Sequence, residues 1–330
     1  MKMKSRFLSE RELIKGIRRD FSGSEVPDLR LGIGDDAAVF SSSRDDWVIT
    51  KDLLVEDFHF LFPSHPADLL GRKSLNINLS DLAAMGARPR FALLGLGMPD
   101  GTSPDWVRDF FEGLRSAAFE FGVALIGGDL TGADKITISV TALGAAPASG
   151  VIPRSGARPG DTVYVSGTLG DSAGGLALAR RGILLGSGER EDYLLRAFLD
   201  PNPRVELGKR IGALGGAGAM IDVSDGLSTD LGHICEESGV GAEIEAARIP
   251  LSEALRELSP DPQRDALHGG EDYELILTIP SRNEEAIQDL SNEFALTRIG
   301  RITEDRKMIL VHPDGTRSPL RKAGWQHFKG

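Results

Sequence analysis

The alternation of apolar and polar positions along the chain predicts a protein that mixes helices and strands. Short, mostly apolar runs rich in β-branched residues predict strands, and longer segments with apolar residues every three or four positions predict helices. The helices are expected at residues 8–19, 66–86, 103–122, 171–181, 204–214, 226–239 and 281–294, and the strands at 47–54, 91–98, 123–128, 135–146, 161–167, 219–224, 242–247, 273–280, 296–302 and 307–311. Because strands and helices do not alternate strictly, this order favours an α+β fold over a doubly wound parallel sheet.

A stretch rich in Pro, Gly and Ser divides the chain near its middle. Residues 147–160 read PASGVIPRSGARPG, a composition typical of a connection between folded units. At roughly 150 residues per domain, a chain of 330 residues suggests two domains. We therefore expect an N-terminal domain over residues 1–148 and a C-terminal domain over residues 149–330.

The helix expected at 66–86 carries a polar stripe between two apolar flanks. Ser74, Asn78, Asp81 and Met85 are spaced so that they share one face of the helix. Leucine, isoleucine and alanine residues lie on both sides of this stripe. Such a pattern is typical of a helix that lines a polar cavity; the alternative is a buried Asp–Asn pair that satisfies only itself.

Composition and charge exclude several classes of protein. The sequence has 38 Lys and Arg residues against 49 Asp and Glu residues, a formal net charge of −11, so nucleic acids and anionic membrane surfaces would be repelled. Cys235 is the single cysteine, which excludes an intrachain disulfide framework and a cysteine-rich zinc site. The charged start, MKMKSRFLSERELIKG, does not resemble a signal peptide, and no stretch approaches the ~20 apolar residues of a transmembrane helix. We expect a soluble cytoplasmic protein.

Acidic residues recur beside glycine or at the ends of apolar elements. An aspartate beside glycine is usually a turn former, and this alternative applies to each residue taken singly. Carboxylates that converge would repel one another unless a hard cation bridged them, and Mg²⁺ prefers such oxygen ligands. The pattern therefore indicates a shared site for several Mg²⁺ ions. The residues that carry it are Asp35, Asp36, Asp52, Asp81, Asp129, Asp222, Asp225, Glu271 and Asp272.

Other features could meet an anionic or aromatic ligand, each with a plain alternative. Residues 167–176, GTLGDSAGGL, form a Gly-rich turn whose backbone N–H groups could bind phosphate, or a simple strand–helix connection. Arg154 suits a bidentate phosphate contact or is a solvated loop arginine. His59 is the histidine best placed to approach a ligand, unless it is an ordinary loop residue, and Trp325 could stack on a ring or cap a core. The HExxH pattern of zinc catalysis is absent from the sequence.

An ordered set of motifs resembles the thiamine-monophosphate kinase family. From about residue 30 to Trp325 they read LGIGDDAAV, TKDLLVEDFHF, NLSDLAAMGA, LIGGDLT, RSGARPGD, SGTLGDSAGGL, IDVSDGLSTDLGHI and GGEDYEL. This family is related to aminoimidazole-ribonucleotide synthetase and selenophosphate synthetase. The resemblance implies in-line transfer of the ATP γ-phosphate to thiamine monophosphate, with several Mg²⁺ ions and ATP as co-substrate. It also implies an N-terminal domain that binds ATP and Mg²⁺ and pairs its sheet across a homodimer, and a C-terminal α/β sandwich that completes the nucleotide and substrate sites.

The resemblance further assigns roles to individual residues. Those at metal-binding positions of the family are Asp36, Thr50, Lys51, Asp52, Asp81, Asp129, Asp222 and Asp225. Those at ATP-binding positions are Gly128, Asp129, Arg154 and Ser224. Those at thiamine-phosphate positions are His59, Glu271 and Trp325. We expect no covalent or general-base catalyst, because the acceptor phosphate has a second pKa of about 6 and is largely ionised at neutral pH.

The chain departs from the family pattern at two positions. Lys51 stands where the family usually has a small hydroxyl residue, and Asp57 where it usually has glycine or another small residue. A lysine side chain beside a metal cluster would repel a cation or replace one, whereas its backbone carbonyl could still coordinate. The alternatives to a thiamine-monophosphate kinase are another ATP-dependent synthetase of the same superfamily and a catalytically silent protein that binds ATP or thiamine phosphate.

Overall fold

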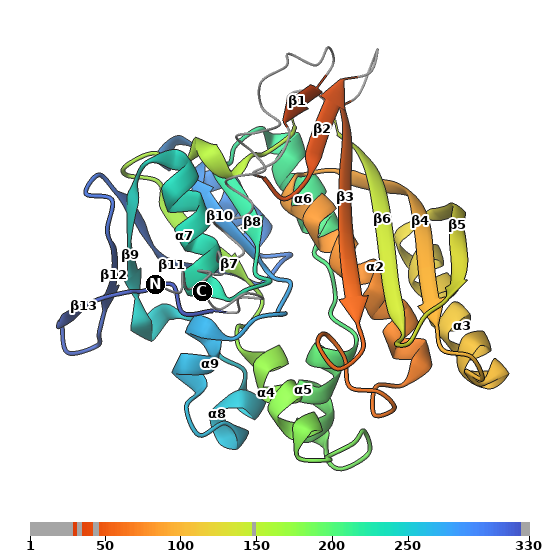
Figure 1. Ribbon diagram of the computed structural model, residues 1–330. Coiled ribbons are helices and arrows are strands. Elements are labelled where there is room, and N and C mark those ends of the chain that lie inside the picture. The colour runs from red at the N-terminus through yellow and green to blue at the C-terminus, as the bar shows by residue number, and fades with distance from the viewer. Residues whose placement is uncertain (1–28, 32–34, 42–45, 147–149, 325–330) are drawn as a thin grey trace, which may run out of the picture.

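Two β-sheets with their associated helices make up the protein (Figure 1). The computed structural model describes residues 29–31, 35–41, 46–146 and 150–324, so the helix expected at 8–19 and Trp325 lie outside the described residues. Helices and mixed sheets occur along the chain, which confirms the expected α+β class. Within the described residues, no helix has both the length and the apolar character that crossing a membrane requires.

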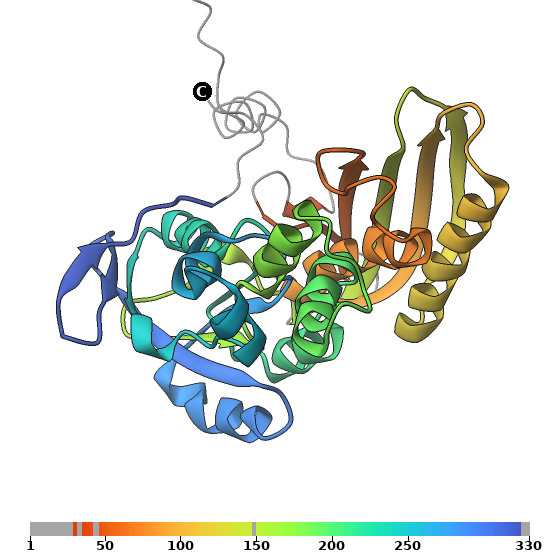
Figure 2. The same ribbon diagram turned by 90° about the horizontal axis from the view of Figure 1, so that it is seen from below.

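The N-terminal sheet has six strands in the order β1-β2-β3-β6-β4-β5. They are β1 (Leu29–Leu31), β2 (Ala38–Ser41), β3 (Asp46–Val55), β4 (Arg88–Met98), β5 (Ala124–Gly132) and β6 (Thr137–Ala146). Helices α2 (Ala67–Ala84) and α3 (Pro104–Phe121) pack against each other, and α2 also contacts β3, β4 and β6 (Figures 1 and 2). Side chains along β6 alternate between buried and half-buried, because the helices cover only one face of the sheet. The edge strand β5 is exposed along its whole length.

The C-terminal sheet has seven strands in the order β13-β12-β9-β11-β7-β10-β8. They are β7 (Thr162–Ser166), β8 (Ala219–Asp222), β9 (Gly241–Glu245), β10 (Leu275–Ile279), β11 (Leu296–Thr303), β12 (Met308–Val311) and β13 (Arg317–Pro319). Its α-helices are α4 (Asp171–Arg180), α5 (Glu189–Leu199), α6 (Val205–Leu214), α7 (Leu227–Ser238), α8 (Glu253–Leu258), α9 (Pro262–His268) and α10 (Glu284–Ser291). Short 3₁₀ turns are η1 (Arg154–Gly156), η2 (Ala246–Arg248) and η3 (Ser281–Asn283). Strand β12 runs parallel to β9, and the other pairs of this sheet are antiparallel.

The structure adds six elements that the apolar pattern does not predict: β1, β2, α5, α8, α9 and β13. Helix α5 begins within residues 186–192, GSGERED, whose glycine and charge are typical of a loop. Its apolar residues nevertheless recur one helical turn apart and are buried on one face. Helices α8 and α9 have six and seven residues, too few for a helical period to be recognised.

Helix α2 joins the two halves of the chain. The Nε atom of Arg72 donates hydrogen bonds of 2.9 and 2.8 Å to the two carboxylate oxygens of Asp200, just after α5. The side-chain amide of Asn76 donates to the carbonyl oxygen of Pro201 at 2.9 Å. A single cluster of buried apolar side chains also runs from α2 into β8 and β10. These contacts hold the polar stripe of α2 against the edge of the C-terminal sheet.

Candidate active site

Three aspartate carboxylates that lie far apart in the sequence meet beside α2. Asp36 lies just before β2, Asp81 in the last turn of α2, and Asp222 at the end of β8. One carboxylate oxygen from each residue lies within 4.8 Å of the other two. Since α2 contacts both β3 and β8, the fold brings together residues from both sheets that the sequence predicts as metal ligands.

Burial and neighbouring carboxylates raise the pKa of Asp81 and Asp222, and burial raises that of the neighbouring Asp52. Burial, and then repulsion by Asp52, Asp222 and Asp36, hold the pKa of Asp81 well above its ordinary value. Burial, followed by repulsion from Asp36, raises the pKa of Asp222 to about 8. Burial raises the pKa of Asp52 to about 6, against the opposing charge of Lys51. Asp36, Asp52, Asp81 and Asp222 are called the aspartate cluster below; because like charges this close repel one another, the arrangement favours a bound cation.

Hydroxyl and amide groups orient the aspartate cluster. The Oγ1 atom of Thr50, on β3, donates a hydrogen bond of 2.5 Å to Asp81. The side-chain oxygen of Asn78, on α2, accepts one of 3.1 Å from the backbone N–H of Asp52. The polar stripe of α2 therefore lines the site, and Asn78 bonds to the backbone of β3 rather than forming a closed pair with an aspartate side chain.

Arg154 supplies positive charge to the cluster. Its Nε and one terminal nitrogen each donate a hydrogen bond of 2.5 Å to the carboxylate of Asp36. Burial alone would lower the pKa of Arg154, but the charges of Asp36 and Asp35 outweigh it and raise the pKa. The backbone N–H of Arg154 donates a hydrogen bond of 3.2 Å to the carboxylate of Asp35. Burial and the charge of Asp36 raise the pKa of Asp35 to about 7. A phosphate entering this site would compete with Asp36 for the guanidinium.

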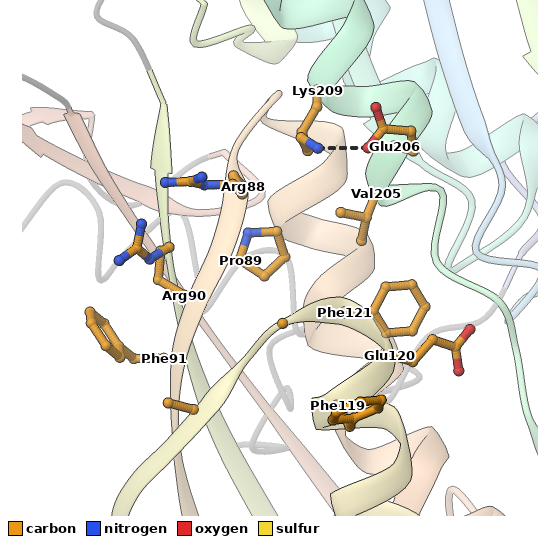
Figure 3. Close-up of a pocket in the computed structure, with 12 residues that line it drawn as sticks. Arg88, Pro89, Arg90, Phe91, Phe119, Glu120, Phe121, Val205, Glu206 and Lys209 are labelled. Atoms are coloured by element: carbon orange, nitrogen blue, oxygen red, sulfur yellow. Dashed lines mark hydrogen bonds and ion pairs between the residues drawn. The ribbon is translucent and has the colours of Figure 1, made fainter.

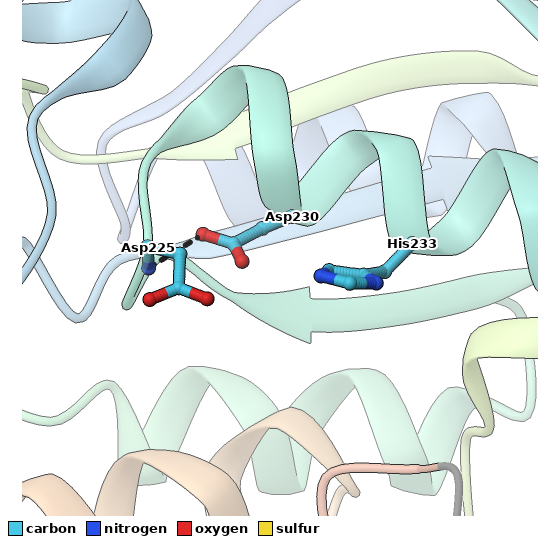
Figure 4. A group of neighbouring side chains, drawn as sticks. All are labelled: Asp225, Asp230 and His233. Carbon is cyan, nitrogen blue, oxygen red and sulfur yellow. Dashed lines mark hydrogen bonds between the residues drawn. The ribbon is translucent and has the colours of Figure 1, made fainter. Parts of the chain in front are cut away.

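A second group of potential ligands lies at the start of α7 (Figure 4). Ligand atoms of Asp225, Asp230 and His233 lie within 4.8 Å of one another. Asp230 accepts hydrogen bonds from the backbone N–H groups of Asp225 (3.0 Å) and Gly226 (2.9 Å), and burial, with the charge of Asp225, raises its pKa well above the ordinary value. Asp225 is a predicted metal ligand. Asp230 and His233 are not among the predicted ligands, although their spacing of three residues places them on one helix face.

Two of the residues assigned to nucleotide and substrate are joined through the backbone. The N–H of Glu271 donates to the carbonyl oxygen of Ser224 at 2.7 Å. The carboxylate of Glu271 also lies 3.3 Å from the buried ammonium of Lys73. His59 lies in the turn after β3, where its Nδ1 accepts a hydrogen bond of 3.0 Å from the N–H of Val55. This bond assigns Nδ1 as the unprotonated nitrogen of the ring.

Both departures from the family pattern lie in or beside β3. The side chain of Lys51 is exposed and donates a hydrogen bond to Ser139 on β6. Because side chains alternate along a strand, Lys51 points to the face of the sheet opposite to Thr50 and Asp52, so its ammonium acts on Asp52 by charge and not by a contact. Asp57 has a positive φ of 68°, a conformation that favours glycine, which agrees with the small residue usual at this position.

Gly128 and Asp129 also lie away from the aspartate cluster of their own chain. They are on the edge strand β5, three strands from β3, a separation of about 14 Å at the usual strand spacing. Asp129 is opposite Gly95, which is opposite Ser139, so its exposed side chain shares the outer face of the sheet with Lys51. Trp325 lies outside the described residues.

Two backbone amides of the Gly-rich turn before α4 are bonded to a side chain of the protein in this structure. Asp272 occupies them: its carboxylate accepts hydrogen bonds from the N–H groups of Gly170 (2.6 Å) and Ser172 (3.1 Å). Burial raises the pKa of Asp272 well above its ordinary value. Asp272 therefore caps this strand–helix connection from within the protein at these two amides.

We expect Asp272→Ala to lower the free energy of unfolding by about 1–3 kcal/mol, because two buried amides lose their acceptor. Urea denaturation followed by circular dichroism measures this change. Asp100→Ala, at an exposed position, is the matched control and should change stability by less than ~0.5 kcal/mol. Equal stability of the two variants would contradict a capping role for Asp272.

A surface pocket of about 780 Å³ is lined by none of the predicted site residues (Figure 3). It lies between the start of β4, the end of α3 and α6, with Arg88 and Arg90 directed to the same side. Each of its two glutamates is paired with a positively charged side chain: Glu206 with Lys209 at 2.6 Å, and Glu120 with Arg72 at 2.9 Å. The pocket thus lacks the converging carboxylates of the aspartate cluster.

Comparisons with known proteins agree with the motifs. Residues 34–146 match the family model "AIR synthase related protein, N-terminal domain", and residues 158–313 match the corresponding C-terminal domain. The thiamine-monophosphate kinase of Escherichia coli (strain K12) is 40% identical over 307 residues, which cover 91% of this chain and 93% of that protein. The chain belongs to the thiamine-monophosphate kinase family. The enzyme of that name from Bacillus subtilis (strain 168) is 36% identical over 306 residues, 91% of this chain and 94% of the relative.

Solved structures of thiamine-monophosphate kinases have the same fold. The structure "AaThiL complexed with AMPPCP and TMP" superposes with a TM-score of 0.86 at 33% identity and covers 99% of both chains. The thiamine-monophosphate kinase of Stenotrophomonas maltophilia K279a gives a TM-score of 0.77 at 41% identity, covering 94% of this chain and 96% of that one. Family and fold class, both predicted from the sequence, are confirmed.

Proposed function

We propose that this protein transfers the γ-phosphate of ATP to thiamine monophosphate, giving thiamine diphosphate and ADP. The observation that carries the proposal is the match over 99% of the chain to a thiamine-monophosphate kinase complexed with AMPPCP, an ATP analogue, and TMP. The aspartate cluster adds a site with the chemistry that phosphoryl transfer requires: positioning and neutralisation of negative charge.

The metal proposed for this site is Mg²⁺, bound at several positions. The donor set supports it, because Asp36, Asp81 and Asp222 offer carboxylate oxygens within 4.8 Å of one another and Mg²⁺ prefers oxygen ligands. When bound, the cations would neutralise phosphate oxygens of both substrates. The full proposed ligand set is Asp36, Thr50, Lys51, Asp52, Asp81, Asp129, Asp222 and Asp225, with Lys51 acting through its backbone carbonyl.

The other predicted site residues have proposed roles in binding ATP or thiamine monophosphate, which follow from the chemistry of their side chains. Arg154 would release Asp36 and bind a phosphate through its planar guanidinium, while Gly128, Asp129 and Ser224 would contact ATP. His59, Glu271 and Trp325 would hold thiamine monophosphate. Since the acceptor phosphate is already largely ionised at neutral pH, no side chain has to remove a proton, and transfer would proceed directly, in line and without a phosphoenzyme.

The proposal includes a homodimer formed through the outer face and edge of the N-terminal sheet. Exposed apolar side chains lie on the outer face, as Leu53 and Leu93 do, and on the edge strand β5, as Ile126 and Leu130 do, and they favour burial against a second copy. Asp129 lies on the same surface, remote from the aspartate cluster of its own chain. We infer that Asp129 completes the site of the partner copy.

The direct test incubates the purified protein with ATP, Mg²⁺ and thiamine monophosphate and measures thiamine diphosphate by chromatography. No product across a range of Mg²⁺ concentrations would overturn the proposal. Binding of both ligands without turnover would favour a silent binding protein. ATP consumption with a ribonucleotide bearing an amide or formyl group, and not with thiamine monophosphate, would favour another synthetase of the superfamily.

Metal removal should make stability depend on pH. The folded-state pKa values of Asp35, Asp52 and Asp222, about 7, 6 and 8, exceed the ordinary value of 3.8, so the folded protein holds more protons than the unfolded chain. In EDTA, the contribution of these three carboxyl groups to the free energy of unfolding should therefore be complete below pH 3.8. It should be lost as the pH rises toward 8.

Mg²⁺ would replace these protons, so it should raise Tm more at pH 8 than at pH 5.5, by about 5 °C at saturating concentration. Differential scanning fluorimetry measures this effect, with NaCl at matched ionic strength as control. A Tm in EDTA that rises between pH 5.5 and 8, or an equal Mg²⁺ effect at both values, would contradict the prediction.

A further inference from the structure

A fully buried lysine lies where α2 meets the C-terminal half of the chain. The side chain of Lys73 is 0% exposed. Its Nζ donates a hydrogen bond of 2.8 Å to the carbonyl oxygen of Phe198, in the last turn of α5, where the helix dipole favours a cation. The ammonium also lies 4.2 Å from the centroid of the Phe198 ring and 3.3 Å from Oε1 of Glu271. An ammonium is tolerated in such a place only when paired, and these contacts provide the pairing.

The surroundings of Lys73 leave Glu271 as its counter-charge. The neighbouring His65 is buried, and burial, with the charge of Lys73, lowers its pKa to about 3. His65 is therefore neutral at physiological pH, with Nε2 3.0 Å from the carbonyl oxygen of Leu199. Burial lowers the pKa of Lys73 while the charge of Glu271 raises it, so the carboxylate helps the ammonium to keep its proton.

Glu271 belongs to a tightly constrained segment beside β8. Its φ is +66°, and that of Tyr273 is +51°, conformations that side-chain-bearing residues rarely adopt. The N–H groups of Glu271 and Tyr273 donate to the carbonyl oxygens of Ser224 (2.7 Å) and Val223 (2.9 Å). The backbone of Glu271 is thus held by the C-terminal half of the chain, while its side chain is held by α2 of the N-terminal half.

We propose that Lys73 is a positioning residue for the acceptor substrate, which it serves through Glu271. This inference rests on the proposed function, in which Glu271 contacts thiamine monophosphate. Lys73 engages Oε1, and the side chain of Glu271 remains 25% exposed, so Oε2 can accept a hydrogen bond from the aminopyrimidine or face the thiazolium cation. Without Lys73 the carboxylate would be free to change rotamer, and the ligand would have to restrict it on binding.

The test is Lys73→Met, which keeps the length and apolar stem of the side chain and removes its charge. We expect the KM for thiamine monophosphate to rise at least ~10-fold, with the KM for ATP within about twofold of wild type. Isothermal titration with thiamine monophosphate alone should show the same loss of affinity. Lys209→Met, at a surface lysine paired with Glu206, is the matched control and should change neither constant.

A double-mutant cycle with Glu271→Gln separates positioning from a general structural role. If Lys73 acts through Glu271, Lys73→Met adds little to the KM for thiamine monophosphate once Glu271 is glutamine. Full multiplication of the two effects, or an equal rise in both KM values, would overturn the proposal. Should Lys73→Met fail to fold, Glu271→Gln alone decides, because an unchanged KM for thiamine monophosphate removes the link. Wild-type protein that forms no thiamine diphosphate would instead refute the proposed function.

Discussion

Asp81→Asn is expected to lower kcat by at least ~10²-fold while raising the Tm of the metal-free protein. Asp81 is repelled by the three other members of the aspartate cluster, so a neutral side chain of the same shape relieves repulsion in the folded state. The same change replaces a negatively charged carboxylate ligand at the centre of the proposed metal site by a neutral amide. Loss of turnover with gain of stability separates a functional carboxylate from a structural one.

Steady-state kinetics at saturating Mg²⁺ and fluorimetry in EDTA measure the two effects of Asp81→Asn. Asp68→Asn is the matched control, because Asp68 lies in the first turn of the same helix and is exposed. This control should leave kcat unchanged and should not raise Tm, because a carboxylate in the first turn of a helix is slightly stabilising. Wild-type turnover in Asp81→Asn would show that the carboxylate is dispensable, and a lower Tm in EDTA would show that it stabilises the fold instead.

Mixing two inactive variants is expected to restore activity. Asp81→Asn damages the aspartate cluster of its own chain, whereas Asp129→Ala, on the outer face of β5, should damage the site of the partner copy. A mixed dimer then contains one site with both defects and one with neither. Equal mixing of the two variants, with subunit exchange, should therefore give about a quarter of wild-type activity.

Each variant alone, and a mixture of Asp81→Asn with Asp52→Ala, serve as controls for the mixing experiment. Asp52 and Asp81 repel each other within one chain, so that mixture leaves every site damaged and should stay inactive. Restoration of activity only in the Asp129→Ala mixture supports a site shared between copies. No restoration, with subunit exchange shown by mass spectrometry, would mean that Asp129 acts in its own chain or not at all.

Much of the fold follows from local pattern. The helix expected at 66–86 is observed as Ala67–Ala84, because its apolar flanks and the proline at its start are local signals. Asp36, Asp81 and Asp222 are predicted as ligands because converging carboxylates repel one another unless a hard cation bridges them. The structure brings them within 4.8 Å of one another. Helix α5 is not predicted, because its short apolar face follows a segment of charged residues and glycines that is typical of a loop.

The residues missed at the site are those whose role depends on a partner far away in the sequence. From the sequence, Lys73 is expected to be a solvated residue on a helix. In the structure it is buried by contacts with α5 and Glu271. Ser80 is one of several small residues on α2, and only β8 gives it a partner, since it donates to Asp222 at 2.6 Å. Asp272 is a potential metal ligand by its position in the sequence, but in the structure it caps α4.

The sequence by itself determined the family, the α+β class and the set of acidic residues available for chemistry, since all of these are written in local order and spacing. Alternation along β3 already implies that Lys51 and Asp52 face opposite ways. Only the tertiary structure decided which face carries α2 and the aspartate cluster, and that β5, with Asp129, is three strands away. The reason is physical: strand order and the pairing of buried charges come from long-range contacts, which no local pattern of polarity records.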